Sequence, residues 1–253
     1  MLAAVTLAFA APVAHAARVS PMIVDLEPTG RDSVGRIELT NDADRDIAYE
    51  VQMMRGEISP EGKLALVPAD DQFVVFPPQA IVEARSQQVF RIQYVGTEAL
   101  DASQVFYLQV KQIPVAFEPG VNQVQVVVNY NVLVNVVPDG SEPVATVRSA
   151  RFIEREQSTE GLTEDEIPEV IPTEAGILVD LANDGSRYFY AGHAAWDITA
   201  TTVDGEPFEA RFERGEMTSV TGVGVVAPGR NRVFFLPTET RLVPDSVEIS
   251  VQP

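Results

Sequence analysis

The sequence contains no cysteine and only two histidines, which leaves few side chains for metal or nucleophilic chemistry. Disulfides, zinc–thiolate sites, redox motifs and cysteine nucleophiles are excluded. His193 could form a triad with a serine and Asp180 or Asp197, but no nucleophile-elbow motif accompanies it. A packed or surface histidine is the alternative. We expect no enzyme activity, no catalytic residue, no metal site and no cofactor.

The first sixteen residues contain no charged side chain. They read MLAAVTLAFAAPVAHA, an apolar run that ends in an A-x-A site at residues 14–16. This pattern predicts that residues 1–16 are a secretory signal peptide and that the protein is exported to the periplasm. The basic n-region is missing, which leaves open a start further upstream. A buried strand or a short membrane anchor is the alternative, although the run is too short to span a bilayer.

Basic residues are scarce, since 18 Lys and Arg stand against 37 Asp and Glu and give a net charge of −19. Such a surface repels nucleic acid and anionic lipid, so we expect neither a nucleic-acid partner nor membrane insertion. Acidic pairs are too abundant here to indicate a glycosidase. Residues 154–174 carry eight acidic residues and one basic residue, Arg155, and are predicted to be an exposed loop. A loose Ca²⁺ site is the alternative, but the Asp-x-Asp-x-Asp-Gly spacing is absent.

The remaining sequence is rich in short β-prone runs separated by turn residues. This spacing predicts an all-β protein built from two β-sandwiches in tandem. Pro138 and the turn-rich residues after it divide the chain into residues 17–138, a linker at 139–145, and residues 146–253. The predicted strands are residues 36–40, 48–53, 72–76, 88–95, 105–113 and 121–137 in the first domain, and 145–152, 176–182, 188–190, 194–202, 219–226, 232–236 and 246–251 in the second.

Three segments of the first domain resemble the PapD-like family of periplasmic pilus and fimbrial assembly chaperones. They are FPPQAIVEARSQQVFRI at residues 76–92, VFYL followed by KQIP at residues 105–114, and NQVQVVVNYNVLVNVVP at residues 122–138. Leu181-Ala182-Asn183 is a weaker match in the second domain. The resemblance implies two immunoglobulin-like domains in tandem, with pilus or fimbrial subunits and an outer-membrane usher as partners.

The run at residues 121–137 is longer than an ordinary strand, and its valines alternate with period two. We expect one long strand over most of it, partly exposed at a sheet edge, where it invites pairing with another chain. The resemblance implies that this strand is donated to a subunit, with Val124, Val126, Val128 and Tyr130 as the subunit-binding residues. The alternative is that the three valines fill the core of their own domain.

The sequence departs from the family where basic residues are expected. Two basic side chains that would hold a subunit's terminal carboxylate align with Val24 and Leu133, and an interdomain charge cluster aligns with Ser103 and Val137. Either another basic group substitutes or the partner docks differently. The chain is then a divergent chaperone or a paralogue with a changed partner. A structural or adhesive component of a cell-surface appendage is the alternative function, although two domains with a short linker favour a chaperone.

Overall fold

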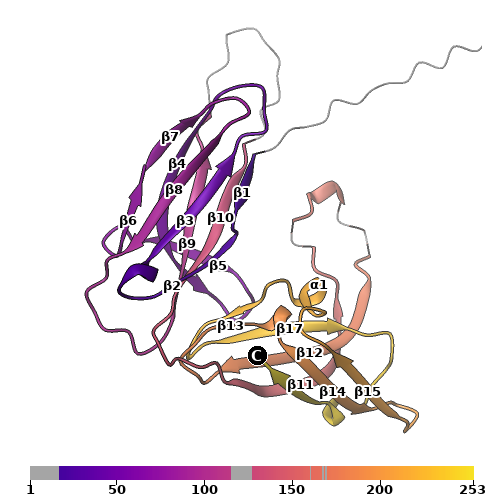
Figure 1. Cartoon of the computed structure of the whole chain (residues 1–253). Coiled ribbons are helices and arrows are strands. Elements are labelled where there is room, and N and C mark those ends of the chain that lie inside the picture. The colour runs from indigo at the N-terminus through magenta and orange to yellow at the C-terminus, as the bar shows by residue number, and fades with distance from the viewer. Residues whose placement is uncertain (1–16, 115–126, 160, 167, 169) are drawn as a thin grey trace, which may run out of the picture.

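The computed structural model describes residues 17–114, 127–159, 161–166, 168 and 170–253. Within them the chain forms two β-sandwich domains set at an angle, with the end of domain 1 resting on domain 2 (Figure 1). Domain 1 comprises strands β1 to β10, and domain 2 comprises strands β11 to β18. The prediction of an all-β protein with two sandwich domains is confirmed.

Domain 1 consists of two packed sheets. One has the order β1-β3-β8-β6, and the other has the order β2-β10-β9-β4-β5 with β7 paired to β4. The strands are β1 (Arg18–Ser20), β2 (Ile23–Leu26), β3 (Val34–Thr40), β4 (Ile47–Ile58), β5 (Leu64–Pro68), β6 (Phe73–Phe76), β7 (Gln79–Val82), β8 (Gln87–Tyr94), β9 (Gln104–Gln112) and β10 (Asn129–Val136), and the 3-10 turn η1 spans Arg31–Ser33. The N-terminal segment contributes to both sheets, because β1 pairs with β3 and β2 pairs with β10.

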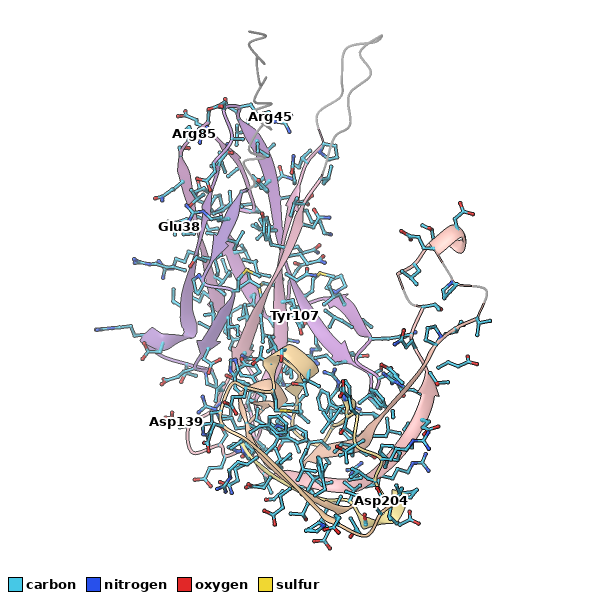
Figure 2. The ribbon with its side chains drawn as sticks, turned by 90° about the vertical axis from the view of Figure 1, so that its right-hand side faces the viewer. Glu38, Arg45, Arg85, Tyr107, Asp139 and Asp204 are labelled. Atoms are coloured by element: carbon cyan, nitrogen blue, oxygen red, sulfur yellow. The ribbon has the colours of Figure 1, made fainter. Side chains whose placement is uncertain are left out.

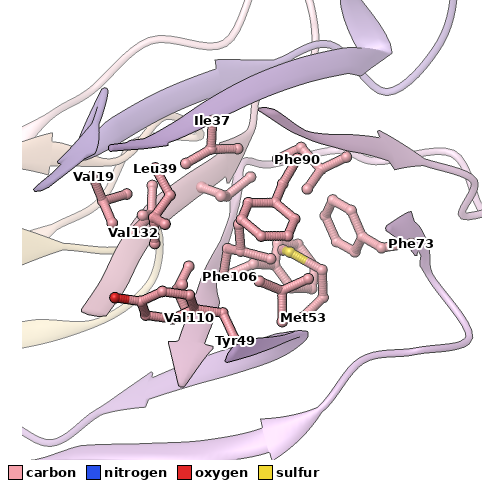
Figure 3. Packing of buried hydrophobic residues seen from close by; sticks show 14 of the residues in the cluster. Val19, Ile37, Leu39, Tyr49, Met53, Phe73, Phe90, Phe106, Val110 and Val132 are labelled. Carbon is pink, nitrogen blue, oxygen red and sulfur yellow. The ribbon is translucent and has the colours of Figure 1, made fainter. Parts of the chain in front are cut away.

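The core of domain 1 follows from period-two alternation in its strands. In β8, Phe90 and Ile92 are fully buried between the sheets, whereas Val89 and Arg91 lie on the outer face. Figure 3 shows Phe90, Met53 and Phe106 in contact at the centre of this cluster, with Phe73 at its side. The Phe73 and Phe106 rings meet edge to face at 4.8 Å between centroids, an arrangement favoured by the ring quadrupoles.

Domain 2 has three sheets, with orders β11-β12-β17, β15-β14-β18 and β13-β16. The elements are β11 (Ala145–Glu156), β12 (Thr173–Asn183), β13 (Phe189–Tyr190), β14 (Ala195–Thr201), β15 (Pro207–Phe212), β16 (Val225–Val226), β17 (Asn231–Pro237), β18 (Glu248–Gln252), the helical turn α1 (Thr218–Thr221), and the 3-10 turns η2 (Glu164–Glu166), η3 (Ala191–His193) and η4 (Pro244–Ser246). Trp196 is fully buried at the centre of this core, and its indole N–H donates to the Ala191 carbonyl.

The same kind of turn occurs once in each domain. Asn41 follows β3 and Asn183 ends β12, and both side chains are fully buried. In each turn the amide Nδ2 donates to a carbonyl four residues later, at Arg45 or Arg187, and to a carbonyl of a distant strand. In each turn the amide Oδ1 also accepts the backbone N–H two residues later. The matching sequences LTNDADR and LANDGSR therefore form the same buried Asn turn in both sandwiches.

Two predictions for domain 2, one strand and one loop, need correction. Residues 219–226 do not form one strand, because Gly222 and Gly224 adopt positive φ angles of 64° and 63°, which break extended backbone. This stretch is instead the helical turn α1 followed by the two-residue β16. The loop predicted at residues 154–174 is also shorter, since β11 continues to Glu156 and β12 begins at Thr173. The two strands extend this hairpin away from the domain (Figure 1).

Candidate binding site: the open edge of β10 and the domain junction

Strand β10 changes its neighbours halfway along its length. β9 pairs with it over all of Asn129–Val136, but β2 pairs with it only over Leu133–Val136. Among the described strands none covers the other side of Asn129–Val132. The prediction of an edge strand is therefore right for the first half of β10 and wrong for the second. The prediction of one strand over most of residues 121–137 is also too long where it can be checked, because residues 127 and 128 precede the strand.

The main-chain groups on the open side can be assigned from the hydrogen bonds to the β2 segment. The N–H of Leu133 donates to the Met22 carbonyl at 2.9 Å, and the N–H of Val137 donates to the Leu26 carbonyl at 2.8 Å. Since main-chain groups alternate in direction along a strand, odd-numbered residues face this side. The N–H and C=O groups of Asn129 and Asn131 therefore point to the open edge, where an added strand would pair.

The side chains of β10 divide between the core and the other face of the sheet. Val132, Val134 and Val136 are fully buried in the domain 1 core. Tyr130 is half-buried against that core, and its hydroxyl donates to the Ala17 carbonyl. Burial raises the pKa of the Tyr130 phenol. From Tyr130 onward, this face of the strand packs against the core of its own domain.

The other predicted subunit-binding residues lie before β10. Val128 is 36% exposed, and Val127 beside it is 39% exposed. The Val128 N–H donates to the Gln112 side-chain oxygen at 3.5 Å, a long contact. Val124 and Val126 lie outside the described residues. The part of the candidate site that the structure describes is thus Val128 and the open main chain of Asn129 and Asn131.

The two aligned anchor positions do not face each other. Leu133 is opposite Ile23 in the parallel pair, whereas Val24 is opposite Val134 and packs against the domain 1 core. Leu133 is buried at the domain junction in a small apolar cluster with Val105 and Val225, against which Ile23 packs. Val24 therefore does not lie on the junction face with Leu133, because neighbouring residues of a strand point to opposite faces. Ile23, which does lie there, is not basic either.

A second feature of the junction is a polar network around Asp25, at the end of β2. The Tyr188 hydroxyl donates to both carboxylate oxygens at 2.6 Å, and the Arg187 guanidinium contacts one of them at 3.2 Å. The fully buried Asn135 of β10 donates to Asp25 at 2.9 Å and lies 3.0 Å from the Tyr190 hydroxyl. Burial, followed by the Asp25 hydrogen bond, raises the pKa of Tyr188 well above 10.0. These bonds join β2 and β10 of domain 1 to the β13 segment of domain 2.

Ser103 and Val137 occupy the positions of the expected interdomain charge cluster. The Ser103 hydroxyl accepts the Tyr188 N–H at 2.8 Å, and its own N–H donates to the Ser186 carbonyl at 2.8 Å. Val137 is buried. Ser103 thus joins the domains through neutral hydrogen bonds rather than charge. The sequence reasoning missed Asp25, Asn135 and Tyr188, and their only sequence signal was a set of polar residues inside strand-like runs.

The other candidate groups from the sequence have structural explanations. His193 is exposed, and its ring meets the Tyr190 ring edge to face at 5.5 Å. Among the residues that the structure describes, no three His, Asp or Glu side chains gather as metal ligands. Within the same residues, no helix has both the length and the apolar character needed to cross a bilayer.

Comparison with known proteins identifies the first domain. Residues 24–142 match the family described as "Pili and flagellar-assembly chaperone, PapD N-terminal domain". No curated protein matches the sequence. Among solved structures, the class 5 fimbriae chaperone CfaA has a TM-score of 0.53 and 10% identity over 94% of this chain and 99% of its own. The E. coli chaperone DraB has a TM-score of 0.50 and 18% identity, with 93% of each chain covered.

A chain from the complex of the Salmonella enterica SafA pilin with the SafB chaperone is also similar, with a TM-score of 0.51, 17% identity and 95% of each chain covered. At these low identities, the structural similarity shows a shared fold over both domains. The family and fold are those of non-enzymatic chaperones. The first domain therefore belongs to the PapD-like pilus assembly chaperone family, and the chain as a whole has the two-domain fold of solved fimbrial chaperones.

Proposed function

We propose that this chaperone acts in the periplasm, binds pilus or fimbrial subunits by adding β10 to an incomplete subunit sandwich, and delivers them to an outer-membrane usher. The observation that carries the proposal is the open main chain of Asn129 and Asn131 in the first half of β10. From Leu133 onward, the same strand is paired on both sides. An unpaired strand edge is a template for another chain, and main-chain hydrogen bonds supply affinity in strand addition.

The apolar residues before β10 support the same proposal. Val128 is exposed and continues the alternation of Tyr130 and Val132. In a subunit that lacks a strand, such side chains would fill the open groove at alternate positions. We propose Val124, Val126, Val128 and Tyr130 as these contacts, with Tyr130 the most constrained because it is tied to Ala17.

Substitutions at Asn131 test strand addition. Asn131→Pro removes a main-chain N–H that has no strand partner within domain 1, so the fold tolerates it as an edge proline. A partner strand would lose one hydrogen bond and meet the proline ring. We expect the affinity for the subunit to fall about tenfold or more, measured by titration with a purified pilus or fimbrial subunit.

Asn131→Ala is the matched control, because it deletes the side chain and its hydrogen bond with Gln109 but keeps the main-chain N–H. It should bind close to the wild-type level. Equal binding by the proline and alanine variants would refute strand addition at this edge. Equal subunit yield with and without the wild-type protein in co-expression would refute the chaperone activity itself.

The alternative function, a structural or adhesive component of an appendage, makes a different prediction. Such a component would remain in the assembled fibre, whereas a chaperone would be absent from purified appendages. The match of the first domain to the chaperone family favours the chaperone.

A further inference from the structure

A cavity of about 630 Å³ separates the two domains along one edge of their junction. The β4–β5 hairpin and the start of β9 line it from domain 1, and residues between 225 and 232 line it from domain 2. Along the other edge, the hydrogen bonds of Asp25 and Asn135 with Tyr188 and Tyr190 join the domains directly. The domains are therefore firmly joined along one edge and loosely packed along the other.

The turn of the β4–β5 hairpin reaches across the cavity to domain 2. The Pro60 carbonyl in this turn accepts the main-chain N–H of Val233 in β17 at 2.7 Å. Val233 lies opposite Asp180 of β12, and β17 is the last strand of its sheet. Because main-chain groups alternate in direction along a strand, the Val233 N–H points away from β12. This hydrogen bond thus joins the two domains and adds nothing to the sheet of domain 2.

The turn has a fixed shape that fits over Arg232. The Ser59 N–H donates to the Lys63 carbonyl and the Gly62 N–H donates to the Ser59 carbonyl, both at 2.9 Å. Gly62 has a φ of +92°, and a Cβ there would come within 2.6 Å of Arg232 Nη2. Both the backbone conformation and the close approach therefore favour glycine. A turn closed by its own hydrogen bonds can move with domain 1 as one piece.

Closure of the turn over Arg232 leaves buried polar groups unpaired. Arg232 Nη1 donates to the Val225 carbonyl at 3.0 Å, but its Nε is buried and has no hydrogen-bond partner among the described residues. The side-chain oxygen of Gln104, which lines the cavity from domain 1, is buried and unpaired in the same sense. Burial also lowers the pKa of Arg232, because desolvation disfavours the charged form.

These unpaired groups oppose the closed junction. Leaving a buried polar group unpaired costs at least as much free energy as one hydrogen bond contributes. The Pro60–Val233 bond therefore closes an edge at which water, if admitted, would hydrate Arg232 and Gln104.

We propose that the β4–β5 turn is a releasable latch that sets the angle between the two domains. Release of the Pro60–Val233 bond opens the cavity edge to water, and the Asp25 network on the opposite edge stays intact as the hinge. Domain closure about a few fixed residues is a common form of conformational change. Opening moves domain 2 relative to the open half of β10. The latch operates with or without a bound chain, so the proposal does not depend on strand addition.

Distances between spin labels in the full protein test the latch. The chain has no cysteine, so two introduced cysteines give one defined pair of labels. Ala65→Cys and Glu239→Cys place one pair between the β4–β5 hairpin and the end of β17. Glu27→Cys and Asp184→Cys place a second pair on the Asp25 edge. All four positions are exposed.

Val233→Pro removes the latch bond, and an edge strand tolerates proline where the N–H points out of the sheet. We expect this variant to lengthen the mean distance of the cavity-edge pair by more than about 2 Å and to leave the Asp25-edge pair unchanged. Val233→Ala is the matched control, because it shortens the side chain and keeps the main-chain N–H. It should match the wild type at both pairs.

A second variant removes the latch from domain 1. Replacing residues 59–63 by Asn-Gly joins Ile58 and Leu64, which face each other in the hairpin, by a two-residue turn and deletes the Pro60 carbonyl. It should lengthen the same distance, and it remains informative if Val233→Pro fails to fold. Unchanged cavity-edge distances in the folded variants, or equal changes at both label pairs, would overturn the proposal. No subunit is present in these measurements, so their outcome is separate from that of the Asn131→Pro test.

Discussion

Asp25 on one side of the domain junction is fully paired, whereas Arg232 on the other side is paired only in part. On the β2 side, the Asp25 carboxylate accepts hydrogen bonds from Tyr188, Arg187 and Asn135. On the β4–β5 side, the Arg232 guanidinium is partly buried and its Nε has no partner. Asp25 remains 38% exposed at its side chain, so water also helps to solvate it. The Asp25 network joins the two domains through paired groups, whereas the Arg232 charge is satisfied only in part by its hydrogen bond to Val225.

The largest expected effect comes from removing the paired charge. Asp25→Ala deprives the Tyr188 hydroxyl and the buried Asn135 amide of their acceptor. We expect the free energy of unfolding to fall by about 1–2 kcal/mol, a modest value because Asp25 is partly exposed. Urea denaturation at neutral pH measures the change. Asp25→Asn keeps an acceptor oxygen, so we expect a smaller loss of unfolding free energy. An Asp25→Ala protein as stable as the wild type would show that the Asp25 network does not stabilise the junction.

Alkaline pH should weaken the same side of the junction. Burial and the Asp25 hydrogen bond raise the pKa of Tyr188, so the folded state holds this proton more tightly than the unfolded state. The stabilisation is fully present below the ordinary tyrosine pKa, about 10, and declines as the pH rises above it.

Tyr188→Phe tests this linkage, because it removes the titrating group and keeps the ring. The melting temperature of the wild type should fall more steeply between about pH 9 and pH 11 than that of the variant. Other buried tyrosines, such as Tyr49 with a pKa raised to about 12, titrate in both proteins and do not affect the difference. Parallel pH profiles would show that Tyr188 does not carry the effect.

The smallest expected effect concerns the incompletely paired charge. Arg232→Met removes a partly desolvated guanidinium and keeps much of the side-chain volume. Because the lost hydrogen bond to Val225 is offset by the relief of desolvation, we expect unfolding free energy within about 1 kcal/mol of the wild type. Thermal or urea unfolding measures the difference. A loss above about 2 kcal/mol would show that Arg232 is mainly an interdomain support.

Alternation predicted most of the long strands, because a half-buried strand has a period of two. It predicted β8 and β9 to within a residue at each end. It missed β5 and β15, which are edge strands without a fully buried residue. It also missed β1, β2 and β7, which are only three or four residues long. It also misread residues 219–226 as a strand, because β-branched residues there dominated over two glycines whose φ angles only the folded turn revealed.

The candidate site was predictable only in part. Valine alternation indicated the segment that leads into β10, but not where pairing with β2 begins, since that depends on the path of a segment more than 100 residues earlier. The alignment likewise placed Val24 beside Leu133, whereas the structure places Ile23 there. A shift of one residue along a strand exchanges its two faces, and sequence spacing alone does not reveal which face meets the second domain.

The sequence by itself determined that this protein is all-β, that it has two sandwich domains, and that it lacks cysteine chemistry, because composition and period-two patterning are local properties. It also carried the motifs of the chaperone family in its first domain. Only the tertiary structure decided which half of β10 is open, which charges are paired, and that Arg232 meets the β4–β5 turn. These features join residues from distant segments, such as Asp25 and Tyr188, which are 163 positions apart. Their energies depend on burial and direction, which the fold alone sets.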